Sequence, residues 1–364
     1  MSSNLLLYIV VATALAFDFT NGFHDTANVV ATSISTRAAS PRLAIAFASL
    51  LNFAGAFISL KVAATVGTGI VEATAITQTI VFAGLVGAIA WNLATWWFGL
   101  PSSSSHALIG GLVGAAFAAQ GAGAIEGDGI VSKVVVPALV APLLAFVVAG
   151  LAILVVYRIV GRLRPGPVTR GFRLGQLASG GLLALSHGTN DAQKTMGIIT
   201  LALVAHGNIA ADAFRVPDWV VIASASAIAL GTYSGGWRII RTMGARIIRM
   251  DPPQGFAAQG AGAVVILAAS HFGYPLSTTH VINGGIMGAG AAKRLSAVRW
   301  GVAGNIVTAW LLTLPMAALG GALVYGITRI FGTGVAGPIV VIAAILLGIV
   351  TLFAARARQQ AATA

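Results

Sequence analysis

Apolar segments of about 20 residues, the length of a transmembrane helix, recur along the whole chain. Barrel strands are shorter and alternate apolar with polar side chains, so this pattern favours membrane-spanning helices. Only 8% of the residues are charged, whereas soluble domains carry about 25%. The sequence therefore predicts an all-α integral membrane protein with no separate soluble domain.

Short polar loops separate the apolar runs, and their charges set the expected orientation. The runs span residues 4–33, 43–66, 79–119, 133–157, 174–204, 219–237, 255–292, 300–327 and 338–354. The basic loops span residues 37–42, 158–173, 238–249 and 293–299. Basic loops are expected in the cytoplasm, and acidic or neutral ones, such as the loop with Glu72, outside. The N-terminus is then outside and the C-terminus cytoplasmic. The net charge of +12 lies in these loops, which argues against a nucleic-acid partner.

Two apolar runs, 79–119 and 255–292, are each interrupted by a proline and a group of hydroxyl residues. The interruptions read Pro101-Ser102-Ser103-Ser104-Ser105-His106 and Pro275-Leu276-Ser277-Thr278-Thr279-His280. By the charge rule, each run starts and ends on the same side, so each is predicted to form a re-entrant helical hairpin. Phe98-Gly99-Leu100-Pro101 also corresponds to Phe272-Gly273-Tyr274-Pro275.

The chain is therefore predicted to be an inverted-repeat transporter. Each half makes an odd number of crossings, so the second copy has the opposite orientation, and the substrate site of such proteins lies between the repeats. We expect a first repeat at 1–157, a cytoplasmic linker at 158–173, a second repeat at 174–328, and an extra span with a cytoplasmic tail at 329–364.

Each half also begins with an acidic motif inside an apolar run. The motifs are Asn21-Gly22-Phe23-His24-Asp25-Thr26-Ala27-Asn28 and Ser186-His187-Gly188-Thr189-Asn190-Asp191-Ala192-Gln193-Lys194. A charge at bilayer depth costs about 2.5–3.5 kcal/mol on insertion scales, so such residues usually have a function. Asp25 and Asp191 are predicted to bind the coupling cation or a metal, with Asn21 assisting. His24, His187 and Lys194 are candidates for proton relay or metal binding. The alternative is a structural pair between Asp191 and Lys194.

The hydroxyl groups after each proline are expected at a helix N-terminus, where free N–H groups and the helix dipole favour an oxyanion. Two such tips from opposite faces can enclose a tetrahedral anion, although these hydroxyls are also common helix caps. The predicted substrate-binding residues are Ser103, Ser104, Ser105, Ser277, Thr278, Thr279, Asn28 and Asn190.

These motifs, together with Gly236-Trp237-Arg238 and Arg241-Thr242-Met243-Gly244, resemble the PiT (Pho4) family of inorganic phosphate transporters over nearly the whole chain. The resemblance implies a helical inverted-repeat carrier, often a homodimer, that imports phosphate with a cation. Bacterial-type members carry metal–phosphate complexes with protons, and animal-type members use sodium. Asn52 and Gln259 stand where animal-type members carry glutamate, which favours the bacterial type.

The predicted function is a plasma-membrane symporter that imports phosphate as a divalent metal complex, such as magnesium phosphate, with a proton. No resident cofactor and no enzymatic activity are expected. The alternatives are sodium-coupled phosphate symport and transport of another oxyanion such as sulfate. An intramembrane aspartyl protease would need its carboxylates about 3 Å apart and would leave the hydroxyl tips unexplained. A channel fits the hairpins less well than a carrier.

Overall fold

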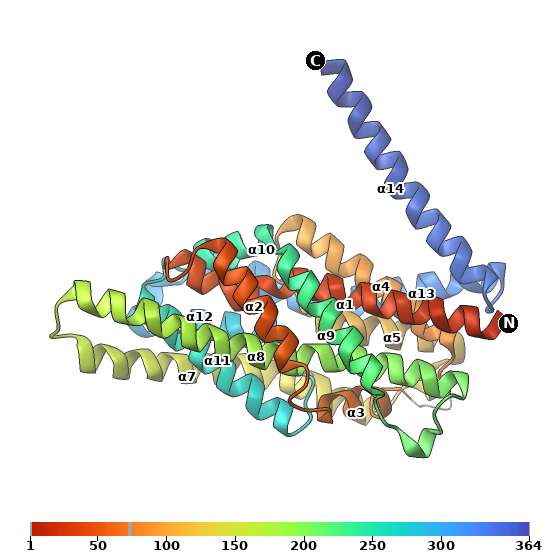
Figure 1. Ribbon diagram of the computed structural model, residues 1–364, viewed down its shortest axis with the longest axis horizontal. Helices are drawn as coiled ribbons and strands as arrows, with labels where there is room; N and C mark the ends of the chain where they lie inside the picture. Colours follow the sequence, from red (N-terminus) through yellow and green to blue (C-terminus); the bar gives the residue numbers. More distant parts are fainter. Residues whose placement is uncertain (1, 72–74, 364) are drawn as a thin grey trace.

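The structure, a computed structural model, describes residues 2–71 and 75–363, and Glu72 lies outside these residues. Its architecture is helical, as the sequence predicts (Figure 1). The helices are α1 (Ser2–Ser35), α2 (Pro41–Gly55), α3 (Lys61–Thr68), α4 (Gln78–Phe98), α5 (Ser104–Gln120), α6 (Gly127–Ile130), α7 (Val136–Val160), α8 (Pro165–His206), α9 (Asp218–Ser234), α10 (Trp237–Arg241), α11 (Pro252–His271), α12 (Thr278–Lys293), α13 (Trp300–Phe331) and α14 (Ala336–Thr363).

Local sequence signals set the ends of the two interrupted runs. Gly99 ends α4 in the left-handed conformation, with φ of 66°, which costs glycine little. Asp251 and Gln254 form a capping box at the start of α11, where each side chain bonds the other residue's backbone N–H. The run 79–119 therefore becomes α4 and α5, and the run 255–292 becomes α11 and α12.

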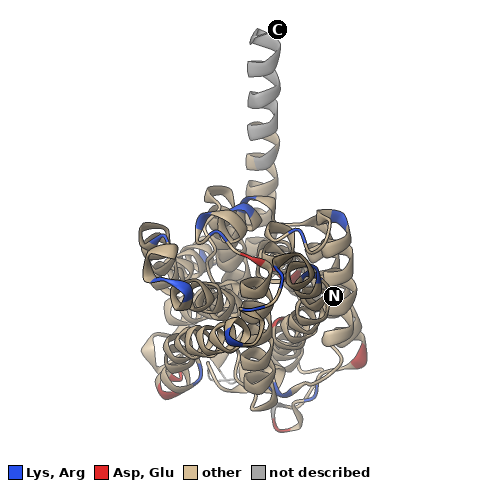
Figure 2. Ribbon diagram, turned by 90° about the vertical axis from the view of Figure 1, so that its left-hand side faces the viewer, with Lys and Arg blue, Asp and Glu red and all other residues tan. Residues whose placement is uncertain are grey.

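Several helices are long and apolar enough to cross a bilayer. Within the described chain, Ser3–Ser35, Gln78–Phe98, Gly127–Val160 and Trp300–Phe331 pass this test singly. The pair Asp218–Ser234 and Trp237–Arg246 passes it together across a 58° bend. These are fewer than the predicted apolar runs, in part because a helix such as α8 buries many polar side chains inside the bundle. Lysine and arginine predominate on the bundle end shown in Figure 2, where the connection from α7 to α8 lies (Figure 1).

Two segments differ from the sequence reading. The run 43–66 is broken between α2 and α3, and the basic stretch 238–249 is not a simple loop. Its first part forms α10 and the π-helical turn Thr242–Arg246, which contact α1 and bury Ile239, Ile240 and Met243. The stretch 238–249 was predicted to be a loop because basic side chains flank its short apolar helix.

The two halves of the chain interleave. The pair α4 and α5 packs on α13 from the second half, and the pair α11 and α12 packs on α7 from the first half. In the same way, α1 packs on α9, and α2 packs on α8. Each helix pair therefore lies against an outer helix supplied by the other half, and α1 and α8 lie side by side between them.

Glycines allow the closest of these helix approaches. A Cβ atom at Gly114 in α5 would lie 1.9 Å from the carbonyl oxygen of Ala318 in α13. One at Gly288 in α12 would lie 2.0 Å from the carbonyl oxygen of Phe146 in α7. Small residues at such positions let helix backbones meet inside a membrane.

We expect Gly114→Ala and Gly288→Ala each to lower the melting temperature of the purified protein. The added methyl group would clash with a backbone carbonyl, which cannot move away as a flexible side chain can. Overpacking of this kind costs about 1–3 kcal/mol. Gly326→Ala is the matched control, since Gly326 lies in α13 with open space around it. Equal melting temperatures for the three variants would contradict this account of the packing.

Candidate functional site

The interrupted runs bring two hydroxyl-rich helix starts together in the interior. Ser103 caps α5 by accepting the His106 N–H at 3.0 Å, and Ser277 caps α12 by accepting the His280 N–H at 3.3 Å. These hydroxyls are the caps that the sequence offered as the alternative. The next residues are free to face the site: Ser104, Ser105, Thr278 and Thr279 are all buried. Ser105 Oγ donates to the Leu276 carbonyl at 3.1 Å, which joins one tip to the other.

Asp25 in α1 lies between the two tips. Its Oδ2 accepts hydrogen bonds from Ser104 Oγ at 2.8 Å and from Thr278 Oγ1 at 3.5 Å. Its Oδ1 lies 2.6 Å from His24 Nδ1 and 3.4 Å from Thr279 Oγ1. The Nε2 atom of His24 is in turn 3.2 Å from the Thr95 hydroxyl. A buried carboxylate thus occupies the hydroxyl groups that a bound anion would need.

Asp191 in α8 takes the matching position from the second half. Its Oδ2 accepts from Thr278 Oγ1 at 3.4 Å, and its Oδ1 accepts from Lys194 Nζ at 2.6 Å. Lys194 also donates to Ser105 Oγ at 2.5 Å and to the Leu276 carbonyl at 2.7 Å. The ammonium group therefore binds both Asp191 and the two tips, so the pairing is not a separate structural contact.

Residues at corresponding positions of the two motifs make corresponding contacts. Asp25 bonds Ser104, and Asp191 bonds Thr278, its counterpart on the other tip. Asn28, three residues after Asp25, donates to Thr279 Oγ1 at 2.9 Å. Lys194, three residues after Asp191, bonds Ser105, which is the counterpart of Thr279.

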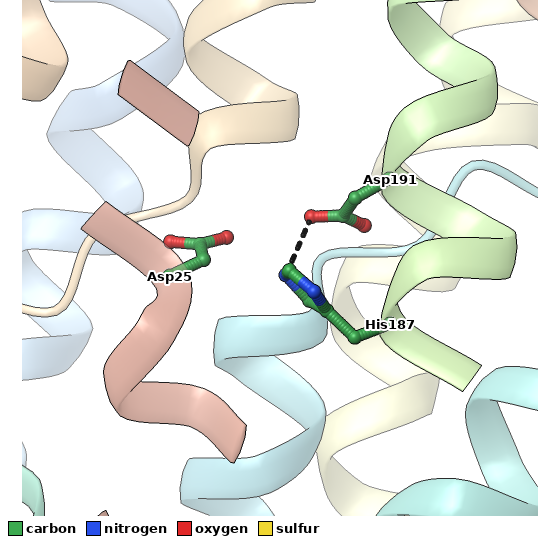
Figure 3. Close-up of side chains that lie close together, drawn as sticks. All are labelled: Asp25, His187 and Asp191. Carbon is green, nitrogen blue, oxygen red and sulfur yellow. Dashed lines mark ion pairs between the residues drawn. The ribbon is translucent and has the colours of Figure 1, made fainter. Parts of the chain in front are cut away.

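Asp25, His187 and Asp191 form a group that could hold a metal ion. One ligand atom from each of them lies within 4.8 Å of the others, and all three residues are buried. Figure 3 shows Asp25 on α1 pointing toward the two residues on α8. His187 Nε2 is 3.3 Å from Asp191 Oδ2, and its Nδ1 is 3.1 Å from the amide oxygen of Asn52. Carboxylate and imidazole groups are common ligands of divalent metals.

The other two predicted amides lie to either side of this group. Asn190 Nδ2 donates to Ser270 Oγ at 2.8 Å and to the Tyr274 carbonyl at 3.1 Å, so it supports the turn between α11 and α12. Asn21 is buried, and its side-chain oxygen has no hydrogen-bond partner. Neither Asn190 nor Asn21 makes a hydrogen bond to Asp25 or Asp191 in the described structure.

A third buried carboxylate, Asp18, was not found from the sequence. Both of its oxygens lack a hydrogen-bond partner, and it is fully buried beside Asn21 and Thr195. It lies near Asp191 and Lys194, at the contact between α1 and α8. The spacing could have identified Asp18 as a candidate site residue. Asp18 and Asp25 are seven residues, or about two helical turns, apart, so they share a helix face.

The two histidines that end the hydroxyl motifs lie away from the carboxylates. The rings of His106 and His280 pack edge to face at 4.8 Å, and His280 stacks on Trp310 at 4.0 Å. Both line an apolar cavity of about 700 Å³ between α5, α7, α12 and α13. Neither contacts Asp25 or Asp191 in the described hydrogen bonds.

Basic side chains bond the carbonyl end of the first helix of each pair. Arg238 Nη1 donates to the Trp97 carbonyl at 2.5 Å, and the Thr242 hydroxyl donates to the Gly99 carbonyl at 2.8 Å. At the other pair, Lys61 Nζ donates to the His271 carbonyl at 3.0 Å. Cations at a helix C-terminus are favourable because of the dipole and the free carbonyls there. These contacts link α10 to α4, and α3 to α11.

Comparisons with known proteins bear on this arrangement. Residues 21–321 match the model of a family described as the phosphate transporter family. A "probable low-affinity inorganic phosphate transporter" of Mycobacterium bovis is 54% identical over 90% of this chain and 78% of its own length. A protein of the same description from Rhizobium meliloti is 51% identical over 88% of this chain and 96% of its own.

One solved structure is similar to the whole fold. It is titled "The sodium-dependent phosphate transporter", and the alignment has a TM-score of 0.78 at 25% identity. It covers 89% of this chain and 99% of that chain. The related sequences are named as transporters, which agrees with the prediction of a membrane carrier rather than an enzyme. With the family match over most of its length, the chain belongs to the phosphate transporter family.

Proposed function

We propose that this protein imports inorganic phosphate across the plasma membrane by symport with a cation. The observation that carries the proposal is the meeting of two hydroxyl tips with two buried carboxylates. Ser104 donates to Asp25 at 2.8 Å, and Thr278 lies within 3.5 Å of both Asp25 and Asp191. The family match and the names of the relatives support phosphate as the substrate.

The geometry gives a physical reason for coupling. The tip hydroxyls bond Asp25 and Asp191, but an anion needs the same donors and is repelled by the carboxylates. A bound cation neutralises the carboxylates and releases the hydroxyls and helix N–H groups for phosphate. Phosphate therefore binds only after, or together with, the cation.

The proposed substrate site consists of the two tips with Asn28, while Asn190 and the caps Ser103 and Ser277 hold the tips in place. The proposed cation site consists of Asp25 and Asp191 with Asn21 and His187, and His24 is proposed as a proton relay. Each half is proposed to be one copy of an inverted repeat, 1–157 and 174–328. The matched contacts of Asp25 with Ser104 and of Asp191 with Thr278 support this reading.

The helix pairs α4–α5 and α11–α12 are proposed to be re-entrant hairpins that open to opposite sides. In this proposal the N-terminus is outside, the linker 158–173 is cytoplasmic, and the segment 329–364 adds a last span and a cytoplasmic tail. The contact of Arg238 with the α4 end and that of Lys61 with the α11 end would then open alternately. The homodimer stays a prediction.

The first test is uptake of radiolabelled phosphate into proteoliposomes that contain the purified protein, with sulfate as competitor. Phosphate at neutral pH still has a P–OH group that can donate to a carboxylate, whereas sulfate has none. We expect saturable phosphate uptake that excess sulfate leaves largely unchanged. Equal transport of both anions would replace phosphate with a general oxyanion as the substrate.

For the coupling ion we propose a proton, with phosphate carried as a neutral complex of a divalent metal such as magnesium. Asn52 bonds His187 and Thr232, and Gln259 bonds Ser33 and Ser179, so both amides are held in neutral hydrogen-bond networks. A neutral complex also avoids much of the desolvation cost of a dianion. One proton with this load moves a single net positive charge inward.

We therefore expect uptake to follow a proton gradient, to stop when divalent metal is chelated, and to persist when choline replaces sodium. The measurement is uptake at fixed pH with each gradient varied singly. The second candidate, sodium-coupled symport, rests on the similarity to the structure of a sodium-dependent transporter. Strong sodium dependence that survives chelation would favour that candidate and reject proton coupling.

A further inference from the structure

Lys194 is the only lysine or arginine that the described part of the chain buries; its relative exposure is 1%. Isolated charges of this kind are expensive inside a membrane and usually face a functional site. Its Nζ atom has three oxygen partners: the carboxylate of Asp191, the hydroxyl of Ser105 and the carbonyl of Leu276, at 2.5–2.7 Å. Carboxylate, hydroxyl and carbonyl oxygens are also the ligands that a hard metal cation would choose.

The other half of the chain offers a built-in comparison. Asn28 stands three residues after Asp25, as Lys194 stands three residues after Asp191. Both side chains bond the tip contributed by the opposite half, Asn28 at Thr279 and Lys194 at Ser105. The neutral amide of Asn28 leaves Asp25 without a resident ammonium group. The two halves thus make matching contacts with the tips, but the second has a lysine where the first has an amide.

We propose that the Lys194 ammonium is a built-in cation that takes the place of one transported cation. This inference rests on the proposed cation-coupled uptake and refines its ion requirement. Asp191 already has the Lys194 side chain as its partner at 2.6 Å, so only the carboxylate of Asp25, with His187 beside it, still needs an ion that moves with phosphate. The ammonium also stays attached to α8, so it adds attraction for an anion without being released.

The surroundings of Lys194 fit this role. Asp18 is buried near Lys194, and both of its oxygens lack a hydrogen-bond partner. The side-chain oxygens of Asn21 and Thr195 next to it are also without partners and buried. Removal of the ammonium would therefore leave the Asp191 carboxylate beside several buried oxygens that lack partners. Such a site would take up a small cation from solution.

The decisive variant is Lys194→Asn, which gives the second half the same residue as the first. The test compares its melting temperature in sodium chloride and in choline chloride. We expect sodium to raise the melting temperature of Lys194→Asn and to leave that of the wild type unchanged. Lys194→Gln should respond to sodium, and Lys194→Arg, which keeps the charge, should not. Lys293→Asn is the matched control, because Lys293 pairs with Asp251 at 3.2 Å but is 54% exposed.

The same variants are then tested for phosphate uptake in proteoliposomes. Sodium should stimulate uptake by Lys194→Asn by roughly ten- to hundredfold, the range expected for the loss and recovery of a hydrogen bond to a charged group. Absence of any sodium effect on melting and uptake in both neutral variants would overturn the proposal. Failure of both neutral variants to fold in either salt would also overturn it, since sodium would then not replace the ammonium.

The two readouts separate this proposal from the proposed function. A wild-type protein that takes up no phosphate would contradict phosphate symport. The sodium effect on melting needs no transport, so it still tests whether Lys194 occupies a cation site. A wild type that transports phosphate, with neutral variants indifferent to sodium, would contradict the built-in cation alone.

Discussion

Replacement of Asp25 or Asp191 with asparagine should abolish cation-coupled phosphate uptake. The amide keeps the size of the carboxyl group but removes the charge that a cation neutralises. Asp25→Asn would also place a neutral amide where His24 contacts a carboxylate at 2.6 Å, and Asp191→Asn would leave the Lys194 ammonium without its carboxylate partner. Removal of one partner of a buried ion pair costs about 3–5 kcal/mol, so we expect Asp191→Asn to melt at a lower temperature than Asp25→Asn.

The measurement is the initial rate of phosphate uptake under a fixed cation gradient, with the amount of folded protein determined by size-exclusion chromatography. Asp212→Asn is the control, since Asp212 is an exposed aspartate in the connection between α8 and α9. Wild-type uptake by a folded Asp25→Asn or Asp191→Asn protein would remove that residue from the coupling mechanism.

The second large effect is expected from the tip hydroxyls. Ser104→Ala and Thr278→Ala should each weaken phosphate binding by about ten- to hundredfold, because a hydrogen bond to a charged group contributes about 1.5–3 kcal/mol. These hydroxyls bond Asp25 and Asp191, so their removal also weakens the contacts of the tips with α1 and α8. The double variant should lose more affinity than either single one.

Binding of radiolabelled phosphate to the purified protein measures this effect directly. Thr200→Ala is the matched control, because the Thr200 hydroxyl is buried in α8 but bonds only the Met196 carbonyl of its own helix. Unchanged affinity in the single and double tip variants would show that Ser104 and Thr278 do not bind phosphate.

The elements of the site were visible in the sequence because each one breaks a strong pattern. A carboxylate interrupts an apolar run at Asp25 and Asp191, and a proline with hydroxyl residues interrupts one at residues 101–106 and 275–280. The structure places these four motifs around one point. The sequence did not show which hydroxyl residues of each tip cap the helix and which face the site, because a serine can do either.

Other features depend on tertiary structure and left weaker traces. Asp18 stands in an apolar run like Asp25, but it has no counterpart in the second half, so the repeat did not reveal it. The break between α2 and α3 has no proline, and Gln193 stabilises it by accepting N–H groups of Val62 and Ala63. The exchange of outer helices between the halves depends on packing that no local pattern records.

The close glycine contacts of α5 with α13 and of α12 with α7 set a step size for movement. A backbone carbonyl seated on a glycine cannot slide gradually, because the next residues have side chains that would collide with it. The next equivalent register lies about one helical turn, or 5.4 Å, away. Each tip is therefore held in register with its outer helix. Displacement between them would occur in steps of one helical turn rather than continuously. The tips contact Asp25 in α1 and Asp191 in α8 through side-chain hydrogen bonds instead. Such bonds can break and re-form, so a tip and its outer helix would shift past α1 and α8 as one body.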